Sequence, residues 1–511
     1  MRLDRRDFKQ LTGHLYGEPN PDWSVEYIGH KMGMHFEQRK NIKHAAFVYW
    51  DAERRSKIHA SAFPAGFNLS AWLLKHHEIE LVVTETPIAA LKGQIAQFIV
   101  PDTWLFYLEV ATYIRQRYQG RVIAVTGSVG KTTTRLMVDQ LVRATGRTAV
   151  TNFGNDNVRQ VLPQLLTSML SVPDALVAEL SIGTLHPAEL DGHRNPPMSH
   201  YFQATTAIIT QIGGAHQRSV RTGRDDLESS LRQDLATAKT KGRIFERMRP
   251  DGHAILNYDM HPQVYKYLWK TAQRSVNDIY TFSLHDAHAD AYLVDRQDFR
   301  DYSELKLKIL DETVMIQMTI PGNGPVMDLL AACLAVKVQG WALPDLTAAF
   351  KTFKPLRNEL VFHDLKTNQG GLTLVEDTYN STRHSVLNVL SVFRERGRFY
   401  QGPKVLVIET GDDLLAQQAE RLNLSYQQPI LDSGVDVVFG YRDPTITPLI
   451  TALTGKVDQA TYFPKMADLA TAIEALPKDA LVIIKGQHFK YGSDLRKLTP
   501  LLLKQAEMLE V

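Results

Sequence analysis

Hydrophobic residues in the middle of the chain form short continuous runs that alternate with segments of helical periodicity. The apolar runs are VIAVTG (122–127), DALVAEL (174–180), TTAIITQIG (205–213) and HAILNYD (253–259). Helical spacing lies between them, in TTRLMVDQLVRA and in QVLPQLLTSML. Strands that are apolar on both faces and separated by helices are typical of a parallel sheet covered on both sides. The pattern therefore predicts an α/β fold with a central parallel sheet.

The same alternation predicts three domains. The first part of the chain carries strand-like runs such as HAAFVYW and IELVVTE, which indicate a small N-terminal α/β domain. Strict alternation over residues 285–320 fits an antiparallel insertion or edge, and a second series of apolar strands, beginning with LTLVEDTYN, follows Lys354. We predict a small N-terminal domain over 1–105, a central domain over 106–353 and a Rossmann-like C-terminal domain over 354–511.

Composition limits the classes of partner. The 511 residues include 58 Lys and Arg against 56 Asp and Glu, a net charge of +2, so nothing global indicates nucleic acid or an anionic membrane. The N-terminus MRLDRRDFKQ lacks the apolar stretch of a signal peptide, and no apolar run approaches the ~18 residues of a membrane span. The single cysteine, Cys333, fits a buried hydrophobic position. We expect a cytoplasmic protein whose anion site is local.

The most informative segment is VIAVTGSVGKTTT, a strand that runs into a glycine-punctuated turn and then a helix. Such a turn directs backbone N–H groups and a helix N-terminus at a bound anion. Lys131 would place a charge on the outer phosphates of a nucleotide, and Thr132 would offer a hydroxyl to magnesium. The usual spacing GxxxxGK[ST] is not met, because position 125 is valine. The loop predicts a P-loop ATPase-like central domain whose nucleotide contacts are Gly127, Ser128, Gly130, Lys131, Thr132 and Thr133.

This loop resembles the TGxxGKTT loop of the Mur ligases, the ATP-dependent enzymes that form amide bonds in peptidoglycan precursor synthesis. The likeness extends over about residues 105–495. It implies ATP and Mg2+ as cofactors. AELSIGTLHPAEL is similar to the family strand that carries a magnesium-ligating glutamate, here Glu179, and AIITQIGGAHQRS to the stretch that ends in a metal-binding histidine, here His216. ATAKTKGRIF resembles the segment with a carbamylated lysine, which is Lys241 or, as the second choice, Lys239.

Further motifs extend the resemblance into the C-terminal part of the chain. AILNYD is similar to the family strand that ends near the nucleotide, which implies Asn257 and Asp259 as contacts, although Asn-x-Asp turns also form for local reasons. VEDTYNSTRHSV resembles the DDSYNANPDSM signature. That likeness implies that Asp377, Tyr379 and Asn380 face the ATP and the incoming substrate, and IIKGQH places Lys485 near the second substrate.

Several positions depart from the family pattern. GNGPVMDLLAA replaces GRHNVYNALAA, and Gln211 and Gly214 replace an asparagine and a glutamate. Glu359 falls where the family linker has arginine, with Arg357 two residues away. The N-terminal domain shows neither a DSR-type segment nor a glycine-rich element for a UDP-sugar.

Three hypotheses follow. The first is an ATP-dependent carboxylate–amine ligase of Mur type that acts through an acyl phosphate. It implies Lys131, His216 and Lys241 as catalytic groups and Thr132, Glu179, His216 and Lys241 around the metal. Its partners would be a small-molecule or nucleotide-linked acid and an amino acid or dipeptide amine. The second is the peptidoglycan ligase that adds D-alanyl-D-alanine, and the third is a non-catalytic nucleotide-binding scaffold.

Overall fold

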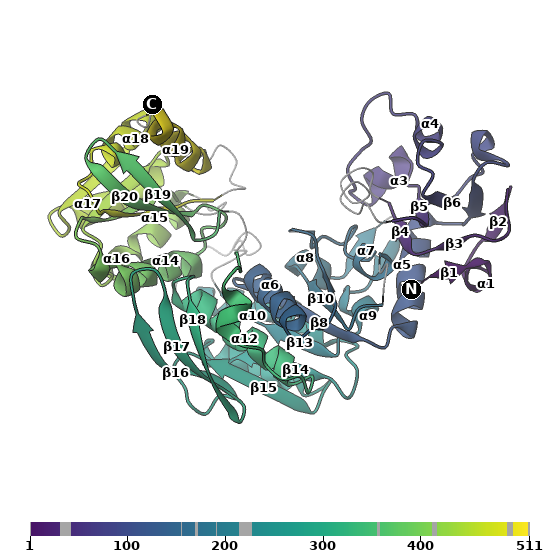
Figure 1. Cartoon of the computed structure of the whole chain (residues 1–511), viewed down its shortest axis with the longest axis horizontal. Coiled ribbons are helices and arrows are strands. Elements are labelled where there is room, and N and C mark those ends of the chain that lie inside the picture. The colour runs from purple at the N-terminus through teal and green to yellow at the C-terminus, as the bar shows by residue number, and fades with distance from the viewer. Residues whose placement is uncertain are drawn as a thin grey trace.

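Three sheets lie along an arc in a computed structural model of the chain, with the N-terminus at one end and the C-terminus at the other (Figure 1). The structure describes residues 2–30, 42–154, 156–168, 172–190, 192–213, 227–354, 358–410, 416–487 and 494–508. Each of the three main sheets falls inside one of the segments predicted as domains. The boundaries at 105/106 and 353/354 themselves stay predictions.

The N-terminal sheet is small and mixed. Its strands in spatial order are β2 (His14–Tyr16), β7 (Ala96–Ile99), β6 (Ile79–Thr84), β5 (Ala45–Val48) and β4 (Tyr27–Gly29). Only β2 runs antiparallel to its neighbour. A short pair, β1 (Leu3–Asp4) and β3 (Ser24–Val25), and the helices α1 (Arg5–Phe8), α3 (Ala52–Lys57) and α4 (Leu69–Leu73) complete this part.

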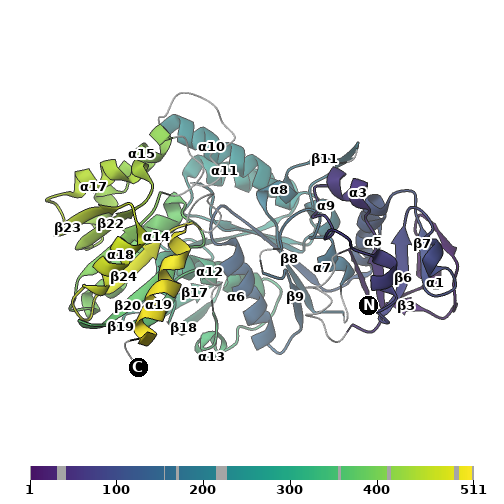
Figure 2. The same ribbon diagram turned by 90° about the horizontal axis from the view of Figure 1, so that it is seen from above.

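Helix α5 (Thr103–Arg117) connects the N-terminal sheet to the central one, as the arrangement in Figure 2 shows. It begins at Asp102, whose carboxylate accepts a hydrogen bond from the Leu105 backbone N–H (2.7 Å). Trp104 is completely buried, and its indole N–H donates to Asn195 of the central domain (3.0 Å). The predicted boundary at 105/106 therefore lies within the first turn of a helix that packs against both neighbours.

The central sheet is parallel except at one edge. In the described residues its order is β18 (Glu312–Met318), β17 (Ser303–Ile309), β16 (Ala291–Asp298), β15 (Asp278–Ser283), β14 (His253–Asn257), β13 (Thr206–Ile209), β8 (Arg121–Thr126), β10 (Ala175–Glu179) and β9 (Ala149–Thr151). Only β17 and β18 pair antiparallel to their neighbours. The alternating residues 285–320 thus form an edge of the sheet, as the sequence predicted.

Alternate residues of β8 enter two separate cores, which explains its continuous apolar sequence. Val122 and Ala124 pack in a core shared with α5 and α11 (Pro262–Ala272). Ile123 and Val125 pack in a second core, with α6 (Lys131–Ala144) and α12 (Asn323–Lys337). Because successive side chains of a strand point to opposite faces, a strand covered on both sides needs no polar positions.

The C-terminal sheet repeats this design. Its order is β19 (Val361–Thr367), β20 (Gly370–Asp377), β24 (Leu481–Lys485), β21 (Lys404–Ile408), β22 (Val437–Tyr441) and β23 (Gln459–Phe463), and only β19 is antiparallel. Its helices include α14 (Arg383–Arg396), α15 (Ala416–Leu424), α17 (Thr447–Leu453), α18 (Met466–Glu474) and α19 (Leu498–Met508). The α/β class with a parallel central sheet is confirmed.

One predicted helix is much shorter than expected. Within the described part of the helical pattern, residues 160–168, the only α-helix is α7 (Gln164–Thr167). Pro163 stands at its N-cap, where the missing N–H and the fixed φ interrupt a longer helix. Cys333 is fully buried within α12, where burial raises the pKa of its thiol, in keeping with the structural position expected for it. None of the described helices is long and apolar enough to span a membrane.

Candidate active site

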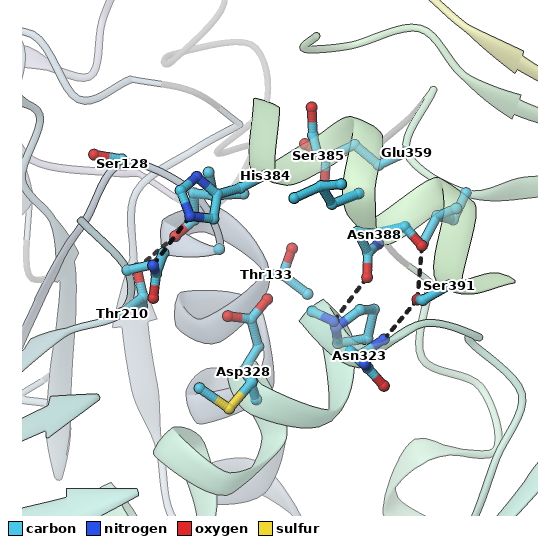
Figure 3. A pocket seen from close by; sticks show the side chains of 18 of the residues that line it. Ser128, Thr133, Thr210, Asn323, Asp328, Glu359, His384, Ser385, Asn388 and Ser391 are labelled. Atoms are coloured by element: carbon cyan, nitrogen blue, oxygen red, sulfur yellow. Dashed lines mark hydrogen bonds between the residues drawn. The ribbon is translucent and has the colours of Figure 1, made fainter. Parts of the chain in front are cut away.

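A cavity of about 460 Å3 lies where the central and C-terminal domains meet (Figure 3). One side is formed by the loop after β8, by the ends of β13 and β14 and by the start of α12, and the other by residues of the C-terminal domain. The chain order reverses at β8, which has β13 on one side and β10 on the other. Ligands of open parallel sheets bind at the carboxyl ends of strands at such a switch point.

The loop after β8 has the local geometry of an anion site. Gly130 caps α6 with φ at 83°, a left-handed conformation that glycine adopts without strain. A Cβ atom at this position would lie 2.2 Å from Oδ1 of Asp328, so a side chain has no room. The Lys131 ammonium donates to the backbone oxygen of Ser128 (3.2 Å). Lys131, Thr132 and Thr133 all line the cavity beside the helix N-terminus.

Asp328 is a buried residue of this site that the sequence did not single out. It lies in α12, accepts a hydrogen bond from the Thr134 hydroxyl (2.9 Å) and lines the cavity. Burial raises the pKa of its carboxyl well above the usual range. The signal available in the sequence was a lone carboxylate at the head of the apolar run DLLAACLAV. It belongs to the divergent GNGPVMD segment, several of whose residues line the cavity.

Glu179 ends β10 and is almost completely buried. One carboxylate oxygen accepts a hydrogen bond from the Asn157 side chain (2.8 Å). The other lies 3.5 Å from Nε of Arg135, and neither of these two atoms makes a hydrogen bond within the described residues. A buried carboxylate oxygen with an open coordination position is the kind of donor that a hard cation needs.

The structure separates the two candidate lysines at the end of α10 (Leu227–Lys241). Lys239 is exposed, whereas Lys241 is fully buried and donates to the backbone oxygen of Gly127 (2.7 Å). Burial, and then the charge of Lys131, lower the pKa of the Lys241 ammonium well below its usual value, and the Glu179 charge opposes this. Lys241 therefore lies with the phosphate loop and Glu179, and Lys239 does not.

The histidine expected at the metal lies outside the described residues, as do Gly214 and Arg357. The metal-binding role of His216 therefore stays a prediction. Within the residues that the structure does describe, no three His, Cys, Asp or Glu side chains are grouped so that they could hold a metal ion.

Asn257 and Asp259 line the cavity but are largely occupied by local hydrogen bonds. The Asn257 amide donates to Gln211 Oε1 (2.7 Å), and Gln211 in turn contacts Nε2 of His384 from the C-terminal domain (3.2 Å). Asp259 accepts hydrogen bonds from Ser283 Oγ (2.5 Å) and the Leu284 N–H (2.8 Å). Both carboxylate oxygens of Asp259 therefore already accept hydrogen bonds from nearby protein groups, as expected if the Asn-x-Asp turn forms for local reasons.

The C-terminal domain brings Asp377, Tyr379, Asn380 and Lys485 to the same cavity. The buried Lys485 ammonium donates to Asp377 Oδ2 (2.8 Å) and to the backbone oxygen of Asn380 (2.5 Å). Burial raises the pKa of Asp377, and Lys485 opposes the shift. Burial also raises the pKa of Tyr379 to about 12, so its hydroxyl stays protonated. This arrangement places a fixed charge pair opposite the phosphate loop.

The central domain and the whole chain are similar to known enzymes. The Mur ligase middle domain family matches residues 125–336. A UDP-N-acetylmuramoyl-tripeptide–D-alanyl-D-alanine ligase of Bacillus subtilis (strain 168) is 27% identical over 489 residues, covering 94% of this chain and 95% of the relative. The ligase of that name from Escherichia coli (strain K12) is 26% identical over 346 residues, covering 67% and 69%.

Solved structures show the same fold. MurF from Acinetobacter baumannii superposes with a TM-score of 0.71 at 19% identity, and the match covers 99% of both chains. The MurF ligase from Thermotoga maritima in complex with ADP gives a TM-score of 0.68 at 16% identity, covering 92% of this chain and 96% of that one.

A glycine-rich loop at the switch point of a parallel sheet faces a second α/β domain across the cavity, and the relatives that the chain matches are named as ligases. The chain carries a match to the Mur ligase middle domain over residues 125–336 and is similar to a Mur ligase over nearly its whole length. It is an ATP-dependent ligase that forms an amide bond between an acid and an amine, and the scaffold hypothesis is set aside.

Proposed function

We propose that this ligase joins D-alanyl-D-alanine to a UDP-linked muramoyl tripeptide. The observation that carries the proposal is the extent of the B. subtilis match, which spans 94% of the chain and so includes the N-terminal sheet. That sheet is the part in which the sequence pattern showed no element for a UDP-sugar. The names of both relatives specify these two substrates.

The residues around the phosphate loop support ATP as the phosphoryl donor. The N-terminus of α6 and the Lys131 ammonium would hold the phosphates, because both favour anions. Asn257, Asp259 and the start of α12 line the same cavity further along and would enclose the nucleoside. Asp377, Tyr379 and Asn380 would face the reacting groups from the C-terminal domain.

The donor set also fits magnesium. The buried Glu179 Oε2, which has Arg135 as an ion-pair partner at 3.5 Å but makes no hydrogen bond in the described residues, and the Thr132 hydroxyl in the cavity are oxygen donors of the kind this cation prefers. The buried Lys241 amine has a lowered pKa, so its neutral form is accessible to react with carbon dioxide, and the resulting carbamate would add anionic oxygens. Bound Mg2+ would neutralise charge on the transferring phosphoryl group and polarise the acid.

The reaction then needs positioning and charge neutralisation more than covalent chemistry by the protein. The acid of the acceptor attacks the γ-phosphate of ATP, ADP leaves, and the acyl phosphate that forms is attacked by the amine. Lys131 and the loop N–H groups hold the phosphate charges, and the C-terminal domain contributes the opposite wall of the cavity and excludes water.

The test measures phosphate release by the purified protein with ATP, Mg2+, UDP-N-acetylmuramoyl-tripeptide and D-alanyl-D-alanine, with mass spectrometry of the products. We expect one phosphate for each dipeptide-extended product, and a loss of about 100-fold or more in K131A, the order expected when a group that neutralises transition-state charge is removed. Phosphate release that depends on another acid or amine, with none on this pair, would assign a different acceptor to the same ligase.

A further inference from the structure

We propose that Glu359 binds the ammonium group of the amine substrate and accepts the proton that this group loses before it attacks the acyl phosphate. The inference rests on the proposed function for the identity of the amine, and on the ligase class for the step itself. Glu359 lies between α13 (Leu346–Phe350) and β19, where the chain passes from the central to the C-terminal domain. Glu359 lines the cavity (Figure 3), as Lys131 and Asp377 also do.

A strained backbone holds Glu359 at this place. Its neighbours Asn358 and Leu360 both have left-handed conformations, with φ at 71° and 49°. Asparagine tolerates this region, but it is unfavourable for a bulky residue such as Leu360, and such strain persists only where the surroundings enforce it. Here the Asn358 backbone oxygen accepts the N–H groups of Thr378 and Tyr379 (2.9 and 3.1 Å). The linker is thereby attached directly to the Asp377–Asn380 segment.

A second bond reinforces the attachment. The Asn358 amide donates to Glu376 Oε1 (2.8 Å), which also accepts the Thr378 hydroxyl (2.9 Å). Glu376 is therefore already satisfied, and it is the neighbouring Glu359 carboxyl that remains available to a ligand.

Glu359 has no hydrogen bond or ion pair with any described residue, although it is largely buried. The two described lysines whose charges act on Glu359 are already engaged: Lys485 binds Asp377, and Lys131 binds the Ser128 carbonyl. Burial, and then the charge of Asp377, raise the pKa of Glu359 to about 7, with Lys485 and Lys131 opposing and Glu179 adding to the shift. Glu359 in turn raises the pKa of Asp328 and Tyr379.

The surroundings of Glu359 favour a positively charged ligand. A carboxylate without a partner is stabilised by a cation and repels a phosphate, so Glu359 suits the ammonium of the amine and not the nucleotide. The amine is the one substrate of an acyl-phosphate ligase that arrives with a positive charge. A base whose pKa lies near the operating pH is also efficient at taking up a proton and releasing it again.

The proton balance of the step is complete. The bound ammonium gives one proton to Glu359 and becomes a neutral amine, whose lone pair forms the C–N bond with the acyl carbon. The bond between the acyl carbon and the oxygen that bridges to phosphorus breaks, and phosphate leaves with the electron pair of that bond. The second proton of the nitrogen goes to the departing phosphate, which leaves as hydrogen phosphate, and Glu359 releases its proton to solvent after the product departs.

The experiment compares E359Q with the wild type using two nucleophiles, D-alanyl-D-alanine and hydroxylamine, each with ATP and the acceptor. Hydroxylamine is uncharged at neutral pH and traps the acyl phosphate as a hydroxamate without needing a base. We expect kcat/KM for the dipeptide to fall about 100-fold in E359Q, with loss of the acidic limb of its pH profile. Hydroxamate formation and the ADP dissociation constant should stay within about twofold of the wild type.

Two results would overturn the proposal. If E359Q loses hydroxamate and dipeptide product equally, Glu359 acts on the nucleotide or acid; if it keeps full dipeptide activity, the residue has no role. The matched control is E53Q, which removes an exposed carboxylate of α3 in the N-terminal domain and should change neither product.

A third measurement separates failure of this inference from failure of the proposed function. If the wild type uses neither nucleophile, the assigned acceptor is wrong. The pH dependence of thermal unfolding in the wild type and E359Q then tests whether Glu359 is an available carboxyl. Because its folded pKa is raised from 4.5 to about 7, the folded protein binds more protons than the unfolded chain in that window. The thermal unfolding midpoint of the wild type should fall relative to that of E359Q as pH rises through this window. If the difference between the two unfolding midpoints does not change with pH, Glu359 does not titrate as an available carboxyl in this window.

Discussion

Lys241 is a cationic residue placed where a cation is unfavourable. Its ammonium is fully buried, lies against the Gly127 carbonyl, and shares its surroundings with Lys131. The same burial that disfavours the charged form makes the neutral amine available as a nucleophile. A carbamate formed there would reverse the charge of the position and remove the conflict with Lys131.

We predict that K241A loses ligase activity by about 100-fold or more, the order seen when a group that stabilises transition-state charge is removed. K239A is the matched control, because Lys239 lies two residues away on the same helix but is exposed, and it should keep full activity. Wild-type protein under 13C-labelled carbon dioxide should show a carbamate carbon signal that K241A lacks. Equal losses in both variants would remove Lys241 from the site.

At the scale of a single element, the N-terminus of α6 depends on one backbone conformation. Gly130 has positive φ and faces the Asp328 carboxyl, so the loop, α6 and α12 are packed together at this point. The phosphate site that we propose would therefore depend on the junction between α6 and α12 as well as on the loop sequence.

We predict that G130A lowers both stability and nucleotide affinity. The left-handed backbone alone costs about 1–2 kcal/mol for alanine, and the contact with Asp328 adds to this. Gly146 provides the control, because its φ is also positive, at 80°, but a Cβ there meets nothing within 4 Å. The G146A variant should lose only the backbone contribution in thermal unfolding and should bind ADP normally. Equal destabilisation of the two variants would show that the Asp328 contact is unimportant.

For the whole molecule, the position of the C-terminal domain depends on contacts with the antiparallel edge of the central sheet. Arg296 of β16 binds Asp298 (2.6 Å) and Glu395 of α14, and Glu395 accepts the Gly322 N–H (2.6 Å). Arg396 donates to the Phe299 carbonyl (2.6 Å) in the turn that follows β16. These contacts fix the wall that supplies Asp377 and Lys485 to the cavity.

We predict that R296A destabilises the protein by about 3 kcal/mol, because it leaves the buried Glu395 carboxylate without its partner. Removing Lys57 from its exposed pair with Glu53 should cost no more than about 0.5 kcal/mol. The midpoints of thermal unfolding of R296A and K57A measure the difference. A similar small effect in both would mean that the Arg296 cluster does not hold the two domains together.

Local sequence was sufficient for the phosphate loop and for most strands. The strand, the paired glycines and the Lys-Thr-Thr run are contiguous, and a strand buried on both faces is recognisable because every position is apolar. Of the strands in the three main sheets, the sequence did not predict β2, β4, β9, β15, β19 and β23; the first three are only three residues long, too short for a recognisable pattern.

The sequence by itself determined the α/β class and the resemblance to the Mur ligases, since these depend on spacing within short segments. Only the tertiary structure decided which of the two lysines reaches the loop, that Asp328 packs against Gly130, and that Glu359 lines the cavity with no partner among the residues that the structure describes. Each of these depends on contacts between segments far apart along the chain. Packing between distant segments sets the burial and the charge around each of these residues, and the local sequence around any one position does not determine that packing.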